Sequence, residues 1–255
     1  MKNLSVIGRI FYGIAITIMG LQAICYADFP YMLIPPKHSG IPGIVVIAYI
    51  FGALLMLAGV SIVLNKKIRL FSALLGSILL LIFCFYFIPY QLLANPNYLQ
   101  FGEWENAAKE LALCGGFFVI AHYFSENPPT GFLTKLISLG AIFFAITIIS
   151  FGCDHLLYIN DTADYVPSWV PCHLFWAYFT GIALIGAGIA IVLRIRFGLI
   201  ATLLGAMIFT WFIILHIPKV IDSPFAYKGS EVTSACLALA YSGIAFVIAG
   251  AGKKQ

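Results

Sequence analysis

Eight mostly apolar stretches, each close to 20 residues long, recur along this chain of 255 residues. An α-helix of about that length crosses the hydrocarbon core of a bilayer. The stretches lie at roughly residues 7–27, 43–64, 70–93, 107–124, 133–153, 172–193, 197–217 and 232–250. No long polar segment remains for a water-soluble domain. The sequence therefore predicts an all-α membrane protein with eight transmembrane helices.

Composition agrees with this prediction. Charged residues make up 9% of the chain, whereas a soluble domain carries about 25%. If the N-terminus is cytoplasmic, ten basic residues fall on the inner side and four on the outer side, which is the usual positive-inside bias. Both termini are then cytoplasmic. Because the basic residues act as topology anchors, the positive net charge does not predict a nucleic-acid partner.

The two halves of the chain resemble each other. GALLMLAGVSIVL at 52–64 aligns with GIALIGAGIAIVL at 181–193, and three further pairs of helices align at separations of 128 to 132 residues. We therefore predict two four-helix units, residues 1–124 and 132–255. Four is an even number, so both units begin and end on the same side of the membrane. They are expected to be parallel repeats, each a four-helix bundle, related by an axis along the membrane normal.

The second unit carries polar side chains where the first is apolar or has glutamine. These are Asp154, His155, His173 and His216, which align with Gln22, Ala23, Ile44 and Phe87. All four are predicted at the outer ends of helices. Ionisable residues are expensive in a membrane and are often functional. We therefore predict one outer polar pocket with Trp169 or Trp176 as a wall; in the alternative, shallow histidines contact only lipid head groups or loop carbonyls.

The stretch VPSWVPCHLFWAYFTG at 166–181 also has a purely structural interpretation. Its prolines suit a helix entry, and its tryptophans suit the aromatic belt at a membrane surface. Small residues after it allow close helix contact. This interpretation accounts for the prolines, tryptophans and glycines without a ligand, but it does not account for the clustered titratable residues.

The same residues carry a family resemblance. Asp154 and His155 end one helix, and V-P-x-W-x-P-x-H-x-F-W-x-Y-F-x-G follows at 166–181. This pattern resembles bacterial DoxX-like membrane proteins, and the resemblance covers most of the chain as two such units in tandem. It implies an inner (plasma) membrane location in a bacterium. Some members of the wider family belong to thiosulfate:quinone oxidoreductases or to redox and sulfur-stress assemblies.

Metal and disulfide chemistry receive little support from the sequence. Three histidines and an aspartate suit zinc or iron by composition, but no local pair has the spacing of metal ligands, so no metal is predicted. Cys153 and Cys172 begin and end one outer loop. Outside a bacterial inner membrane disulfides are permitted, so a bridge between these two cysteines stays open.

Three classes of function remain open. The chain is a membrane subunit of a redox system that handles quinone or reduced sulfur at its outer face, a non-catalytic scaffold for partner proteins, or a carrier of a small molecule or lipid. Quinone is the candidate cofactor, and the expected partners are the lipid bilayer and other proteins of a membrane complex. Whether the protein is an enzyme is left open by these residues.

Overall fold

The computed structural model describes residues 2–34, 42–124 and 131–251, which form an all-α protein without strands in these ranges. The predicted all-α class is therefore confirmed. The helices are α1 (Lys2–Tyr26), α2 (Ile44–Leu64), α3 (Ile68–Ile82), α4 (Ile88–Leu93), α5 (Glu105–Tyr123), α6 (Phe132–Ser138), α7 (Gly140–Leu157), α8 (Ile159–Tyr165), α9 (His173–Val192), α10 (Phe197–Trp211), α11 (Ile217–Asp222) and α12 (Ser230–Ala251).

Seven helical spans of the described residues are long and apolar enough to cross a membrane. They are Asn3–Tyr26, Ile44–Leu64, Ile68–Leu93, Phe132–Leu157, His173–Val192, Phe197–Asp222 and Ala226–Ala251. The eighth predicted span, 107–124, coincides with α5, which is helical but is not among the seven. Its first two turns contain Glu105, Lys109 and Glu110, and these charges lower its hydropathy. The predicted count of eight is thus not confirmed.

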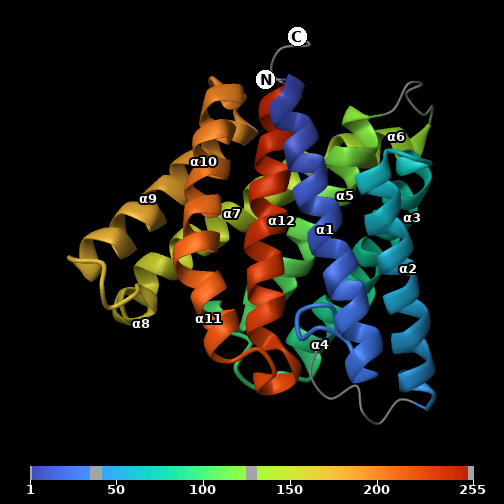
Figure 1. The fold of residues 1–255 in the computed structure, drawn as a ribbon, viewed down its shortest axis with the longest axis horizontal. Helices are drawn as coiled ribbons and strands as arrows, with labels where there is room; N and C mark the ends of the chain where they lie inside the picture. Colours follow the sequence, from blue (N-terminus) through green and yellow to red (C-terminus); the bar gives the residue numbers. More distant parts are fainter. Residues whose placement is uncertain (1, 35–41, 125–130, 252–255) are drawn as a thin grey trace.

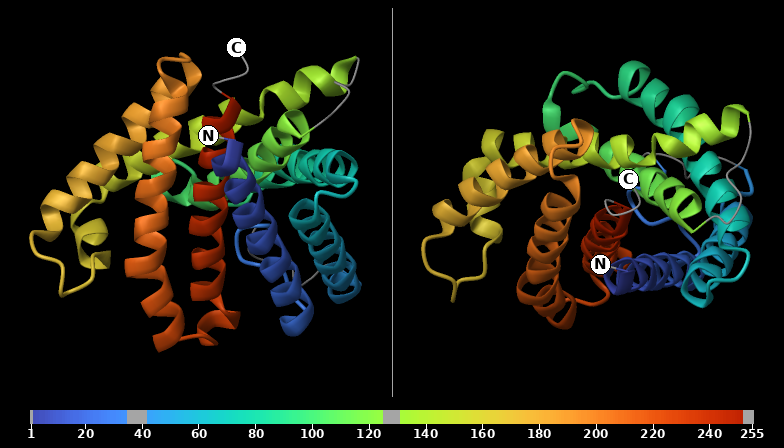
Figure 2. Two further views of the ribbon diagram at one scale, coloured as in Figure 1. Left: turned by 45° about the horizontal axis from the view of Figure 1, so that its top comes forward. Right: turned by 90° about the horizontal axis from the view of Figure 1, so that it is seen from above.

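Helices α5 and α12 form the centre of the molecule. α12 packs against α1, α10 and α5, while α5 packs against α3, α7 and α12. Viewed from above, α12 lies between α1 and α10 (Figure 2). In the most apolar part of the span Ala226–Ala251, which contains α12, 89% is buried inside the protein. The corresponding share for the span Phe197–Asp222 is 17%. A helix that is apolar all round belongs inside a protein or a membrane, and α12 lies in the protein interior.

Glycine pairs let the central helices approach their neighbours closely. A Cβ atom added at Gly243 of α12 would lie 2.6 Å from the carbonyl oxygen of Gly8 in α1, and one added at Gly115 of α5 would lie 2.6 Å from that of Gly140 in α7. Side chains larger than hydrogen do not fit at such separations. Small residues at helix crossings are typical of membrane proteins, because packing rather than water exclusion holds helices together in lipid.

The outer faces of the surrounding helices are apolar. Val46, Ile50 and Leu57 of α2 are exposed, as are Phe175 and Ile182 of α9. Exposed apolar surface of this extent is unusual for a protein in water, but it is the surface expected to contact lipid chains. It agrees with the seven spans in indicating a multi-pass membrane protein.

Two spans contain a π-helical turn, at positions that align between the two halves of the chain. Phe83–Phe87 joins α3 to α4, and Phe212–His216 joins α10 to α11. Each is followed by a proline near the start of the next helix, Pro89 or Pro218. π-turns occur frequently at functional sites, and the second of these two turns ends in a histidine that was predicted as a site residue.

The first helix begins and the last helix ends on the same side of the molecule. In Figure 1 the start of α1 and the end of α12 are at the top, together with α6, whereas α4, α8 and α11 lie at the bottom. The predicted site residues Asp154 and His155 lie at the end of α7 that leads to α8, on this bottom side. We refer to it as the outer end, following the orientation predicted from the basic residues.

Candidate functional site

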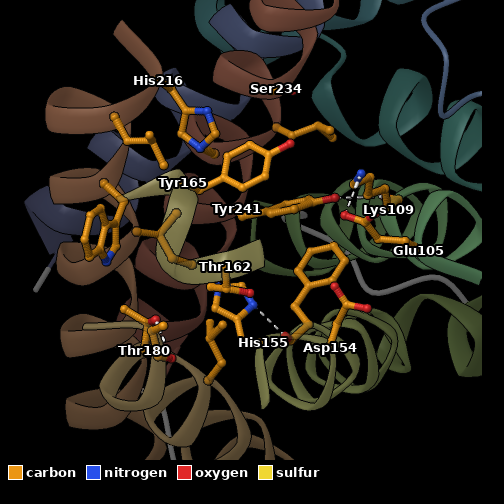
Figure 3. Close-up of a pocket in the computed structure, with 18 of the residues that line it drawn as sticks. Glu105, Lys109, Asp154, His155, Thr162, Tyr165, Thr180, His216, Ser234 and Tyr241 are labelled. Atoms are coloured by element: carbon orange, nitrogen blue, oxygen red, sulfur yellow. Dashed lines mark hydrogen bonds and ion pairs between the residues drawn. The ribbon is translucent and has the colours of Figure 1, made fainter. Parts of the chain in front are cut away.

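A cavity of about 560 Å³ lies at the outer end of the molecule. Helices α7, α9, α10 and α12 supply most of its walls, and α8 and the start of α5 complete it. Its volume falls within the 300–1,000 Å³ range of typical small-molecule sites. Three of the predicted site residues, Asp154, His155 and His216, line it, and Figure 3 shows the first two on the opposite side of the pocket from His216.

The last turn of α7 presents two of these residues. Phe151, Asp154 and His155 lie three and four residues apart, which places them on one face of the helix and in the cavity wall. The Nδ1 atom of His155 is 2.8 Å from the carbonyl oxygen of Phe151. Because a carbonyl only accepts, Nδ1 donates and carries a proton. In neutral His155 the Nε2 atom is then the hydrogen-bond acceptor of the ring.

The π-turn after α10 presents the third residue. In a π-helix residues five apart lie nearly above each other, so Trp211 and His216 both reach the cavity. In a regular α-helix, residues five apart would face away from each other. The Nδ1 atom of His216 is buried without a hydrogen-bond partner among the described residues. Such an atom loses free energy unless water or a ligand satisfies it.

The opposite wall comes from the first half of the chain. Glu105 and Lys109, one turn apart on α5, form an ion pair of 2.8 Å. The Lys109 ammonium lies 5.2 Å from the centre of the Tyr31 ring, a cation–π contact. Both halves of the chain therefore contribute to this cavity.

Hydroxyl groups link this wall to α12. Tyr241 donates a hydrogen bond to the carbonyl oxygen of Lys109 at 3.2 Å, and the hydroxyls of Tyr31 and Ser234 are 3.2 Å apart. Figure 3 shows Tyr241 between the α5 ion pair and the rest of the pocket. These hydrogen bonds fix the two tyrosine rings, so the cavity has rigid aromatic walls.

Polar and apolar groups occupy different parts of the lining. The carboxylates of Glu105, Asp154 and Asp161 come from the ends of α5, α7 and α8. Deeper along the helices the lining is apolar, and consists of Ile148, Leu184, Met207, Ile208 and Leu237. The cavity is therefore amphipathic, with charged groups at its mouth and hydrocarbon at its inner end.

The other three predicted residues do not line this cavity. Trp169 is 67% exposed in the loop before α9. Trp176 is directed to the seam with α10, where its ring packs edge-on against Trp211 at 6.2 Å and its Nε1 donates to the carbonyl oxygen of Pro171. His173 is the first residue of α9. It lies one turn before Ala177, the first residue of α9 in the cavity lining. His173 therefore lies outside the lining of this cavity, although it was predicted to share one pocket with His155 and His216.

Two further features were considered in the sequence. Cys153 and Cys172 are both free cysteines, so no disulfide joins them. Among the described residues no group of three or more histidine, cysteine or acidic side chains is placed to hold a metal ion. The cavity lining consists of hydrogen-bonding, charged, aromatic and aliphatic side chains.

Several lining residues were not predicted. Lys109 and Glu105 belong to the first half, and Tyr31 lies in a loop. A lysine four residues after a glutamate inside an apolar stretch was a usable signal for the ion pair. Nothing in the sequence indicated that this pair would face His155 and His216, since that depends on the packing of α5 against α7 and α12.

No family model, curated protein or solved structure matches the chain. The function must therefore be inferred from the cavity itself.

Proposed function

We propose that this protein is a multi-pass membrane subunit of a redox system, and that its outer cavity binds the head group of a quinone. The observation that carries the proposal is the amphipathic lining, in which His155 and His216 lie above an apolar inner end. A quinone combines carbonyl oxygens on a ring with an apolar tail. An inert scaffold has no need for a cavity with a buried, unpartnered histidine.

The polar groups suit carbonyl oxygens. His216 can donate from its unpartnered Nδ1, and the Lys109 ammonium retains N–H groups beyond the one directed at Glu105. The rings of Tyr241, Phe151 and Trp211 line the space between. Flat aromatic walls favour a flat ring through stacking, and His155 Nε2 is available to accept a proton or a hydrogen bond from the reduced form.

Binding can be tested on the purified protein. We expect protein purified in mild detergent from bacterial membranes to retain a quinone, identified by mass spectrometry of an organic extract. We also expect a short-chain ubiquinone analogue to quench tryptophan fluorescence saturably, and the quenching to be smaller in Trp211→Phe, where Trp176 remains at the edge of the cavity. Recovery of phospholipid alone, with no response to the analogue, would identify a lipid carrier and reject the quinone. Recovery of partner proteins without any quinone response would favour a scaffold.

We further propose that the fold is a tandem repeat of two parallel four-helix units, 1–124 and 132–255, with α5 as an eighth membrane span. The packing of α1 on α2 and α12 has a counterpart in that of α7 on α9 and α5. Cys114 Sγ donates to the carbonyl of Gly76, and Ser242 Oγ to that of Gly205, at equivalent positions of the two units. The paired π-turns and paired glycine contacts also support this arrangement.

The family and location belong to the same proposal. We place the chain among DoxX-like proteins of the bacterial inner membrane on the strength of the motif at 154–181. With both termini cytoplasmic, the cavity opens to the outer side. Electron-transfer partners would then dock at the outer face or in the plane of the membrane.

Orientation gives a separate prediction. After replacement of the six native cysteines, Ser168→Cys should react with a membrane-impermeant maleimide added to intact cells, because Ser168 is exposed at the outer end. Lys66→Cys, exposed in the turn between α2 and α3, should react only after the cells are opened. The opposite pattern of labelling would invert the topology and place the cavity in the cytoplasm.

A further inference from the structure

Glu110 is a fully buried carboxyl group outside the cavity. It lies in the second turn of α5 with 0% of its surface exposed. Both of its carboxyl oxygens lack a hydrogen-bond partner among the described residues. Glutamate is almost never completely buried unless it is paired, so this side chain requires a physical explanation.

No cation lies against Glu110 in the described residues. Its neighbour Lys109 is directed at Glu105, with which it forms an ion pair of 2.8 Å. The titratable groups close enough to interact electrostatically with Glu110 are the thiols of Cys84 in the first π-turn and Cys114 in α5. Neither thiol carries a compensating positive charge. An ionised carboxylate in this position would be unsolvated and unpaired, which is strongly unfavourable.

The position is related to that of His216 in the other half. Glu110 aligns with Ala238, which lines the cavity beside His216, and His216 aligns with Phe87, which is buried at the end of the first π-turn. Each half therefore has a titratable side chain at its π-turn that is unpartnered among the described residues. In the second half this is His216, which belongs to the turn; in the first half it is Glu110, which lies on the central helix α5 that packs against the turn. This is a second, independent place where the chain keeps a proton-binding group inside its core.

We propose that Glu110 is a proton-binding site, a carboxyl group held in its neutral, protonated form inside the first four-helix unit, whose proton exchanges with solvent. Glu110 lies in the second turn of α5, close to the outer end of the molecule, and the π-turn that contains Cys84 lies beside it. π-turns have irregular backbone pairing and recur at functional sites. The proposal goes beyond quinone binding and does not depend on the occupant of the cavity.

Infrared difference spectroscopy tests this directly. We expect the protein at neutral pH to show a carbonyl stretching band of a protonated carboxylic acid that is lost in Glu110→Gln. The amide of glutamine has nearly the same shape as the neutral carboxyl group, so the variant should fold and elute like the unmodified protein. Transfer to D₂O should shift the same band to lower frequency, because the acidic proton is replaced by deuterium.

Glu103→Gln is the matched control. Glu103 is exposed and accepts a hydrogen bond from Asn95, so its replacement should leave the band of the buried carboxyl group unchanged. If Glu110→Gln removes no protonated band, Glu110 is ionised and the proposal is wrong. A band that is lost in the variant but does not shift in D₂O contradicts proton exchange. Quinone retention by Glu110→Gln should equal that of the unmodified protein, so the two proposals fail separately.

Discussion

Replacing His216 by phenylalanine should weaken binding of a quinone analogue by about 10-fold or more while leaving the bundle folded. His216 holds the only histidine ring nitrogen in the cavity that is buried without a partner in the described part of the chain. Loss of one hydrogen bond costs about 0.5–1.5 kcal/mol, which is up to about 10-fold in affinity. The larger apolar ring would also occupy part of the space. Phenylalanine is chosen because Phe87 is buried at the aligned position of the first half.

The control for this experiment is a histidine outside the cavity. His173→Phe places the same substitution at the start of α9, beyond the lining. We expect its affinity for the analogue to stay within about twofold of the unmodified protein, since surface substitutions usually change free energies by less than about 0.5 kcal/mol. Fluorescence titration of both variants checks the result. An equal loss of affinity in the two variants would show that His173 also belongs to the binding site. Unchanged affinity in His216→Phe would show that His216 does not contact the analogue.

Replacing Gly243 by leucine should be the most damaging single change to the fold. An added Cβ would lie 2.6 Å from the Gly8 carbonyl oxygen and 2.9 Å from the Tyr12 nitrogen, both backbone atoms of α1. Backbone atoms cannot turn aside, so α1 would have to separate from α12. Overpacking typically costs 1–3 kcal/mol and sometimes more. We expect a loss near about 3 kcal/mol and a melting temperature lowered by roughly 6–12 °C.

Gly186→Leu provides the matched substitution. Gly186 lies in α9, and nothing is within 4 Å of a Cβ atom built on it. Leucine is a better helix former than glycine, so this variant should melt within about 2 °C of the unmodified protein. Thermal denaturation in detergent measures both. A Gly243→Leu protein that melts normally would show that α1 and α12 do not pack as described.

The cavity and the central helices are physically connected. α5 carries Glu105 and Lys109 toward the cavity and Glu110 toward the first π-turn. α12 supplies Ser234 and Tyr241 to the same cavity. Both helices pack against their neighbours through close glycine contacts, and together they bring polar groups from both halves to one cavity. A variant that loosens this packing should lose ligand and stability together, whereas His216→Phe should lose ligand alone.

Much of the fold followed from local sequence. A helix in lipid must satisfy its backbone hydrogen bonds internally, so each apolar stretch near 20 residues had to be a helix. The helical bounds agree with the predicted stretches within a few residues in most cases, as in α9 (His173–Val192) against 172–193. α5 differed in one respect. Its position was predicted, but its three early charges keep it outside the seven spans that are apolar enough by themselves.

The site was only partly accessible from sequence. Contrast between the halves directed attention to Asp154, His155 and His216, which line one cavity. The same contrast selected His173, because alignment records which residue differs and not how far along a helix the cavity extends. His173 lies four residues before Ala177 on the same face of α9, one turn beyond the first α9 residue in the lining.

By itself the sequence determined that the chain is helical, apolar on its outer faces and polar at one end of its second half, because helix formation and membrane insertion depend on composition over some 20 consecutive residues. Tertiary structure alone decided which polar groups meet. The Glu105–Lys109 pair lines the same cavity as His155 and His216, and Gly115 and Gly243 let α7 and α1 pack closely on the two central helices. The same packing leaves Glu110 without a partner among the described residues. Glu110 follows Lys109 directly in α5, yet its carboxyl group is buried in the core, whereas Lys109 forms an ion pair in the cavity.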